Sequence, residues 1–222
     1  MSLLNNPISV YTTRSILAVG SRSVILGRTH LPPPGQPAIL AIAHLSHYDP
    51  VVAAALLRRK IDFMARAEFY QTPAARWACR HSDCIRIDRY GNALPGIREA
   101  IDRLRRGRLV GIFPEGEIMA GSQSVLNGGP IKGGAALLAR RTGAPIIPCV
   151  LLNSEQHRQV KPWLPLRAGR LWLSLGPPIH PPRDLPAGRA GRAELSLRLA
   201  DALRAIYAEL QQRFRLPSEA CP

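Results

Sequence analysis

Short apolar runs alternate along the chain with longer segments in which apolar residues recur every three or four positions. Residues 92–106 show the second pattern most clearly, since four apolar residues fall at the i, i+3, i+4 and i+7 positions of one helix face: Ile97, Ala100, Ile101 and Leu104. Gly107 follows directly, as is typical of a helix end. Residues 92–106 are therefore predicted to form an amphipathic helix.

The same pattern divides the rest of the chain into elements. Strands are predicted at residues 37–43, 61–65, 84–88, 109–113, 145–152 and 170–175. Further helices are predicted at residues 7–26, 50–60, 72–80, 131–141 and 192–214. Strands that alternate with helices are typical of a largely parallel sheet with helices on both faces. We therefore expect one α/β domain over residues 37–222, preceded by an amphipathic helix and linker over residues 1–36.

Length and composition restrict the class of protein. A chain of 222 residues is long enough for one domain with a substantial core, and 46% hydrophobic residues are too many for a disordered protein. We expect no transmembrane helix, because no apolar run reaches 18 residues, and no secretory signal. The four cysteines are dispersed, so neither a disulfide framework nor a CxxC site is expected. These features favour a reducing cytoplasm.

The formal net charge of +15 favours anionic partners such as an anionic membrane surface, a nucleic acid or a phosphate-bearing cofactor. A GC-rich genome is an alternative explanation of this positive charge, because the chain is rich in Ala, Gly and Pro and its basic residues are nearly all arginines. Aromatic residues make up only 5% of the chain, and no zinc finger, RRM-type aromatic block or basic heptad helix is present. A nucleic-acid-binding protein is therefore disfavoured, and we expect an anionic membrane surface as partner.

The segment from His44 to Asp49 has the residues needed for proton transfer. His44 follows the predicted strand 37–43, and in open α/β sheets sites lie at the carboxyl ends of strands. Asp49 precedes Pro50, which favours a helix start and makes Asp49 a candidate N-cap. A loop histidine folded back on this carboxylate can take a proton from a hydroxyl, as in the base half of a catalytic triad. The attacking hydroxyl can then belong to the substrate.

Several alternatives remain open for this segment. Asp49 could be only a helix cap and His44 only a loop residue. His47 could replace His44 as the base, or His44, His47 and Asp49 could bind a metal ion. A serine hydrolase is disfavoured, because no G-x-S-x-G sequence is present.

Several motifs follow one another along residues 37–152. The segment from His44 to Asp49 has the form H-x-x-x-x-D and includes Ser46. After it come the segment from Phe63 to Glu68 with Arg66, the segment from Cys84 to Arg89, the F-P-E-G segment from Phe113 to Gly116, and the blocks 132–136 and 144–148. In this order they resemble the motifs of the glycerolipid acyltransferase family, which includes bacterial 1-acylglycerol-3-phosphate acyltransferases and often has serine at the position of Ser46 and lysine at that of Arg66.

The resemblance implies an O-acyltransferase in which His44 is the general base and Asp49 orients it. It implies that acyl-CoA or acyl carrier protein is the donor and a lyso-lipid the acceptor, with no metal and no redox cofactor, at the inner face of the cell membrane. The residues that it places at the substrate are Ser46, Arg66, Arg89, Phe113, Pro114, Glu115 and Gly116. Among these, Arg66 and Arg89 are expected to bind a phosphate, because planar guanidinium groups match its oxygens. Glu115 is expected to position the acceptor or the loop beside the base.

One segment departs from the family pattern. The family commonly continues F-P-E-G with Thr-Arg-Ser, whereas this chain has Glu117-Ile118-Met119. A carboxylate at position 117 repels a nearby phosphate, so an acceptor other than lysophosphatidate, including one with a cationic head group, has to be considered. The altered segment also leaves open a lipid-binding protein without turnover. For the oxyanion, backbone N–H groups around Gly116 or Ser46 are the expected donors.

Overall fold

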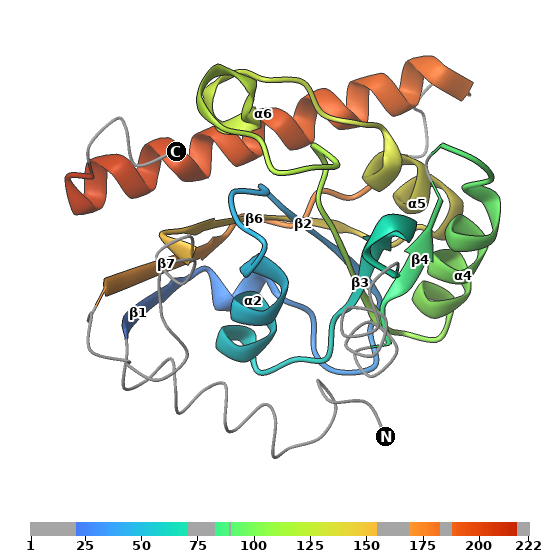
Figure 1. Cartoon of the computed structure of the whole chain (residues 1–222), viewed down its shortest axis with the longest axis horizontal. Coiled ribbons are helices and arrows are strands. Elements are labelled where there is room, and N and C mark those ends of the chain that lie inside the picture. Colours follow the sequence, from blue (N-terminus) through green and yellow to red (C-terminus); the bar gives the residue numbers. More distant parts are fainter. Residues whose placement is uncertain (1–20, 71–82, 89, 155–168, 183–187, 217–222) are drawn as a thin grey trace.

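The computed structural model describes residues 21–70, 83–88, 90–154, 169–182 and 188–216, and within these ranges seven strands form one sheet (Figure 1). The strands are β1 (Ser21–Leu26), β2 (Ala38–Ile42), β3 (Asp62–Arg66), β4 (Ile85–Ile87), β5 (Leu109–Ile112), β6 (Ile146–Leu152) and β7 (Gly169–Leu175). The helices are α2 (Asp49–Leu57), α4 (Leu94–Arg105), α5 (Gly134–Thr142) and α6 (Gly188–Phe214), with short 3-10 turns η1 (Arg28–His30), η2 (Ala67–Tyr70), η3 (Gly121–Gln123) and η4 (Val125–Asn127).

The sheet is largely parallel, in the order β1-β7-β6-β2-β5-β3-β4. The five strands from β6 to β4 in this order all run in the same direction. β7 pairs with β6 in the antiparallel direction, and β1 pairs with β7 in parallel, so the last two strands run the opposite way. The carboxyl ends of β2, β3, β5 and β6 therefore meet at one edge of the sheet, where ligands bind in open α/β sheets.

Helices cover both faces of the sheet, as Figure 1 shows: α2 lies on one side and α4, α5 and α6 on the other. Alternate residues of β2 enter two separate cores. Leu40 and Ile42 pack with α2, whereas Ile39 and Ala41 pack with α4, α5 and α6. All five residues of β2 are buried, because a central strand covered on both faces has no solvent side. This explains the uninterrupted apolar run from which the strand was predicted.

Most of the predicted elements are confirmed, but the predicted helix 7–26 is wrong over its last six residues. Ser21–Leu26 forms the edge strand β1 and belongs to the same sheet as the rest of the domain. Pairing with β7 satisfies the backbone of this segment, and its β-branched Val24 and Ile25 suit a strand. Residues 7–20 and the predicted helix 72–80 lie outside the described residues.

Asp62, at the start of β3, has a buried carboxylate in an ion-pair network with two arginines. Arg108 Nη2 donates to Asp62 Oδ1 at 2.6 Å, Arg108 Nε lies 2.5 Å from Oδ2 in an ion pair, and Arg103 Nη1 lies 3.4 Å from Oδ1. Burial raises the pKa of Asp62, and the nearby positive charges of Arg103, Arg108 and Lys60 oppose this rise. The two arginines are thereby tied to the amino end of the sheet.

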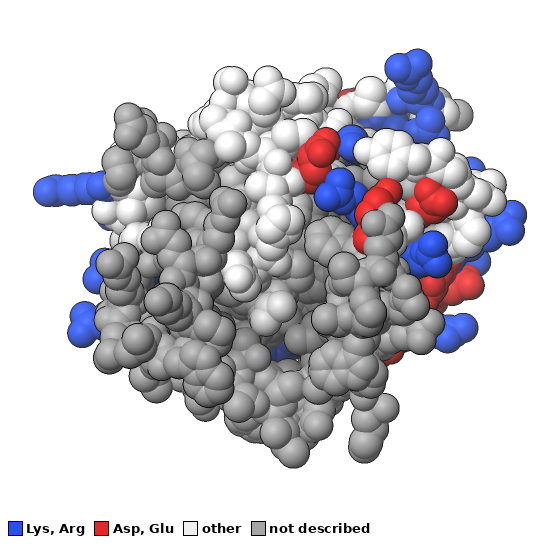
Figure 2. All heavy atoms as spheres, in the orientation of Figure 1, with Lys and Arg blue, Asp and Glu red and all other residues white. Residues whose placement is uncertain are grey.

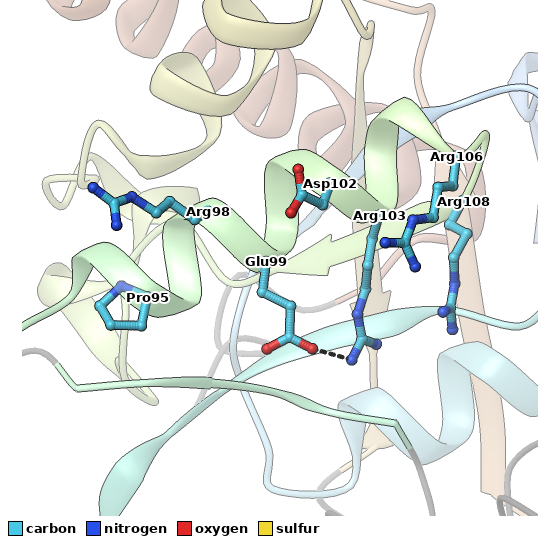
Figure 3. Close-up of a pocket in the computed structure, with 7 residues that line it drawn as sticks. All are labelled: Pro95, Arg98, Glu99, Asp102, Arg103, Arg106 and Arg108. Atoms are coloured by element: carbon cyan, nitrogen blue, oxygen red, sulfur yellow. Dashed lines mark hydrogen bonds and ion pairs between the residues drawn. The ribbon is translucent and has the colours of Figure 1, made fainter.

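The same arginines line a hollow of about 520 Å³ on the outer side of α4 (Figure 3). Its other lining residues include Arg98, Arg106, Glu99 and Asp102, and Arg103 donates to the Glu99 carboxylate. Positive and negative side chains are thus mixed in this hollow, and it contains none of the predicted site residues. Figure 2 shows a similar mixture near α4, while elsewhere on that face Lys and Arg lie around the edge of the described surface. Of the helices that the structure describes, none has the length and apolarity needed to cross a membrane.

Candidate active site

The main chain of His44 is fixed on both sides where it leaves β2. Its backbone N–H donates to Glu115 Oε2 at 2.6 Å, and its carbonyl accepts from the Met119 N–H at 3.2 Å. Just before it, the Ala43 N–H donates to the carbonyl of Cys149 in β6 at 3.1 Å. His44 is therefore held between the ends of β5 and β6, at the edge where the sequence predicted a site.

The imidazole of His44 is hydrogen-bonded to a buried carboxylate. His44 Nδ1 lies 3.0 Å from Asp49 Oδ2, and the exposed fractions of the two side chains are 13% and 0%. The carboxylate oxygen accepts, so Nδ1 is the donor and carries the proton. Nε2 of the neutral ring is then the nitrogen with a free lone pair, which is the arrangement of a general base.

The carboxylate of Asp49 is held by three further donors. Oδ2 also accepts the backbone N–H groups of Leu45 and Ser46, each at 2.9 Å, and Oδ1 accepts the hydroxyl of Ser154. Hydrogen bonds to the charged form of a carboxylate stabilise that form. Asp49 is thus a rigid acceptor whose plane is set before any substrate binds.

The prediction that Asp49 is the N-cap of the helix is wrong. The helix α2 begins at Asp49 itself, Tyr48 precedes it, and Pro50 stands in its first turn. The carboxylate is directed back to the N–H groups of the preceding loop instead of forward into the helix. The loop from His44 to Asp49 is consequently closed by the carboxylate that faces the imidazole.

An aromatic stack supports the other side of the imidazole. The ring of His44 stacks on Phe113 with 3.9 Å between centroids and an interplanar angle of 24°, and Phe113 stacks on Phe63 at 5.7 Å and 12°. Gly111 makes room for this stack, because a Cβ at that position would lie 2.4 Å from Cδ1 of Phe63. Phe113, predicted at the substrate, is therefore in direct contact with the predicted base.

Both carboxylate oxygens of Glu115 are used inside the protein. Oε2 accepts from His44, and Oε1 accepts the Val125 N–H at 3.0 Å and the Ser124 hydroxyl at 3.3 Å. The side chain is 1% exposed, and burial raises its pKa although these hydrogen bonds oppose the rise. Glu115 thus joins the end of β2 to the start of η4, and its role in positioning the loop beside the base stays a prediction.

The remaining predicted residues of the two loops form the scaffold of the site. Ser46 is buried and its Oγ accepts the Tyr48 N–H at 3.2 Å, while the carbonyl of buried Pro114 accepts the Lys132 N–H at 2.7 Å. Gly116 has φ of +90°, a backbone conformation that suits glycine.

The two amides expected to meet the oxyanion already have acceptors. The N–H of Ser46 donates to Asp49, and the N–H of Gly116 donates to the Phe113 carbonyl at 3.0 Å.

Of the two predicted phosphate ligands, Arg66 ends β3 and lies half-buried at the same sheet edge as His44. Arg89 lies outside the described residues.

Three residues of the site were missed from the sequence. Ser154 follows β6, and its contact with Asp49 depends on β6 lying beside β2 in the sheet. Ser124 lies in a loop rich in glycine, where no periodic pattern indicates which side chain turns inward. Phe63 was noted only for its place in a motif, and its ring contact depends on the pairing of β3 with β5. Within the described part of the chain, no three His, Cys, Asp or Glu side chains are grouped so as to hold a metal ion.

Known proteins that are similar to this chain include acyltransferases. The family model described as Acyltransferase matches residues 23–152, more than half of the chain. A 1-acyl-sn-glycerol-3-phosphate acyltransferase of Bacillus subtilis is 25% identical over 143 residues, which cover 64% of this chain and 66% of that protein. A 1-acyl-sn-glycerol-3-phosphate acyltransferase of Chlamydomonas reinhardtii is 26% identical over 168 residues, which cover 72% of this chain and 47% of that protein.

The fold has a solved counterpart. The crystal structure of the 1-acyl-sn-glycerophosphate acyltransferase PlsC from Thermotoga maritima superimposes with a TM-score of 0.64 and 18% identity, over 90% of this chain and 80% of that one. In the sequence comparisons, the chain spans just under two thirds of the length of its Bacillus relative and about half that of its algal relative. On the evidence of the family model, the chain belongs to the acyltransferase family.

Proposed function

We propose that this protein is an O-acyltransferase that moves a fatty acyl group from a thioester to the free hydroxyl of a lysophospholipid. The names of its relatives support the reaction class, since they are called 1-acyl-sn-glycerol-3-phosphate acyltransferases. The observation that carries the proposal is the hydrogen bond from His44 Nδ1 to the buried carboxylate of Asp49, which leaves Nε2 for proton transfer. The donor is acyl-CoA or acyl carrier protein, and the proposal involves no metal.

The reaction follows from the positions of the two side chains. Nε2 of His44 removes the proton of the acceptor hydroxyl as its oxygen attacks the thioester carbonyl carbon. Asp49 stabilises the imidazolium that forms. When the tetrahedral intermediate collapses, the C–S bond breaks and the imidazolium returns its proton to the thiolate. The products are the ester and a free thiol, and the enzyme regains its starting state.

The proposed acceptor is a lysophospholipid, and opposing charges near the site bear on its head group. The relatives' names favour 1-acyl-glycerol-3-phosphate, for which Arg66 and Arg89 are the proposed phosphate ligands. Glu117 is exposed and stands next to Ile118, which replaces the arginine that the family commonly has there, and its charge disfavours an anionic head group. Head-group preference therefore depends on the balance between these charges.

The proposed place of action is the inner face of the cell membrane, where lysophospholipids partition. Apolar side chains are exposed at the helix starts that follow the carboxyl ends of β2 and β4: Tyr48 and Val51 beside the Asp49 loop, and Leu94 at the start of α4. Together with the net charge of +15, this surface suits an anionic bilayer.

The test is release of free thiol from acyl-CoA and from acyl carrier protein, measured with lysophospholipids of anionic, zwitterionic and cationic head groups. We expect thiol release that depends on an acceptor, together with formation of the diacyl product. Acceptor binding without turnover on any donor would instead indicate a lipid-binding protein. Salt-dependent DNA binding without thiol release would indicate a nucleic-acid-binding protein.

A further inference from the structure

We propose that Ser154 is a positioning residue for the acyl transfer, acting through Asp49 on the tautomer and orientation of His44. The proposal rests on the function proposed above and adds a third member to the His44–Asp49 pair. Ser154 lies two residues after β6, 105 positions away from Asp49, and its hydroxyl donates to Asp49 Oδ1. It lies just beyond the residues 23–152 that the family model matches.

The four donors to Asp49 are divided unequally between its two oxygens. Oδ2 receives the imidazole of His44 and the N–H groups of Leu45 and Ser46, all of which belong to the loop that the carboxylate closes. Oδ1 receives Ser154, which comes from a different strand. Ser154 therefore ties the carboxylate to the sheet, whereas the other three donors tie it to its own loop.

Burial gives this hydroxyl its importance. Asp49 and Ser154 are both 0% exposed, so water does not replace the hydroxyl at Oδ1. Without it, the carboxylate loses its donor on one side and can rotate about its Cβ–Cγ bond. Rotation moves Oδ2 away from Nδ1 of His44, and a weaker hydrogen bond at Nδ1 lets the ring adopt the Nε2–H tautomer, which has no free lone pair at Nε2.

The same rotation changes the charge felt by His44. A carboxylate oxygen that moves away from Nδ1 stabilises an imidazolium less. The titratable groups in described contact with His44 are Asp49 at the ring and Glu115 at the backbone N–H, the buried Cys149 lies near Asp49, and the described hydrogen bond of Ser154 is to Asp49. Removal of the hydroxyl should therefore move the acid limb of the pH–rate profile to lower pH.

The variants that test this are Ser154→Ala and Ser154→Cys, with Ser174→Ala as control. Cysteine keeps a side chain of similar shape but is a weak donor, so a role in packing alone predicts normal activity for Ser154→Cys, whereas the donor role predicts a defect in both. Ser174 is also a buried serine, on β7, and the described hydrogen-bond donors to Asp49 are His44, Leu45, Ser46 and Ser154. Circular dichroism and thermal unfolding establish that each variant is folded.

We expect both Ser154 variants to lower kcat about tenfold, the effect of losing one hydrogen bond to a charged group, with KM for donor and acceptor within about twofold. The acid limb should move to lower pH, and Ser174→Ala should match the wild type. Unchanged kcat and acid limb in Ser154→Ala, or normal activity in Ser154→Cys, would overturn the proposal.

A second readout does not depend on turnover. In protein with ¹⁵N-labelled histidine, the signals of His44 are identified among the six histidines by their loss in His44→Gln. The wild type should show the Nδ1–H tautomer and Ser154→Ala a mixture of both tautomers. A wild type that releases no thiol would refute the proposed function, whereas an unchanged tautomer in Ser154→Ala would refute the role of Ser154.

Discussion

The carboxylate of Glu115 accepts the backbone N–H of His44 at 2.6 Å, so the F-P-E-G segment holds the main chain of the proposed base. Its second oxygen is taken by Ser124 and Val125. An amide at position 115 has only one acceptor oxygen, and its NH₂ group would face a donor. We therefore expect Glu115→Gln to lower kcat and to reduce the free energy of unfolding by about 1–3 kcal/mol, the cost of a buried polar group left without a partner.

The same variant reveals the titration of Glu115. Because burial raises the pKa of Glu115, the native protein keeps this proton to a higher pH than the unfolded chain does. The free energy of unfolding contributed by this group is then greatest at low pH and falls as pH rises through that interval. Denaturant unfolding at pH values from the ordinary carboxyl range upward should show the wild type losing stability relative to Glu115→Gln as pH increases. If the difference in free energy of unfolding between the two proteins is constant with pH, or has the opposite slope, the pKa of Glu115 is not raised by burial.

Gly111→Ala tests whether the aromatic stack supports His44. The added Cβ would lie 2.4 Å from the ring of Phe63, which must shift and carry Phe113 with it. We expect a loss of about 1–3 kcal/mol in the free energy of unfolding, as for other overpacked cores, and a lower kcat. In the control Gly133→Ala, the Cβ would meet only the Ser196 hydroxyl at 3.9 Å, so both quantities should stay near wild type. If Gly111→Ala is destabilised but has a normal kcat, the aromatic stack does not support His44 in the reaction.

The proposed phosphate ligands can be tested through the acceptor. We expect Arg66→Gln and Arg89→Gln each to raise the KM for a lysophospholipid with a free phosphate head group about tenfold, because one charge-assisted contact is lost, and to leave the KM for the donor unchanged. Arg98→Gln, on the outer side of α4, is the matched control and should change neither. If only the KM for the donor rises, these arginines bind the donor and not the acceptor phosphate.

Asp62→Asn tests the ion-pair network at the opposite edge of the sheet. The change removes the charge that pairs with Arg108 and Arg103 and should lower the free energy of unfolding by about 3 kcal/mol, the cost of breaking a buried ion pair. Glu194→Gln breaks only the exposed pair with Arg198 on the surface of α6 and should cost less than about 1 kcal/mol. Denaturant unfolding measures both. Equal effects of the two variants would show that the network contributes no more than a surface pair.

Much of the fold could be predicted because the central strands are buried on both faces. β2 and β6 appear in the sequence as uninterrupted apolar runs, and α4 as a clear amphipathic helix. The edge strand β1 could not be recognised, because its stability depends on pairing with β7, about 150 residues away in the sequence. A local pattern carries no information on such a partner.

The candidate site divides in the same way. His44 and Asp49 are close in sequence, and their placement at a strand end and a helix start could be predicted. The direction of the Asp49 carboxylate could not, since a helix cap and a loop closure use the same residue types at the same spacing. Ser154 and Phe63 reach the site through strand order and register, which follow from packing of the whole sheet.

The most direct measurement is thiol release by His44→Gln beside His47→Gln. His47 is an exposed histidine of the same loop and was the alternative base. We predict that His44→Gln lowers kcat about 1,000-fold or more, the contribution of a general base, while His47→Gln stays within about threefold of wild type. Wild-type thiol release by His44→Gln, or a large loss confined to His47→Gln, would contradict the assignment of His44 as the base.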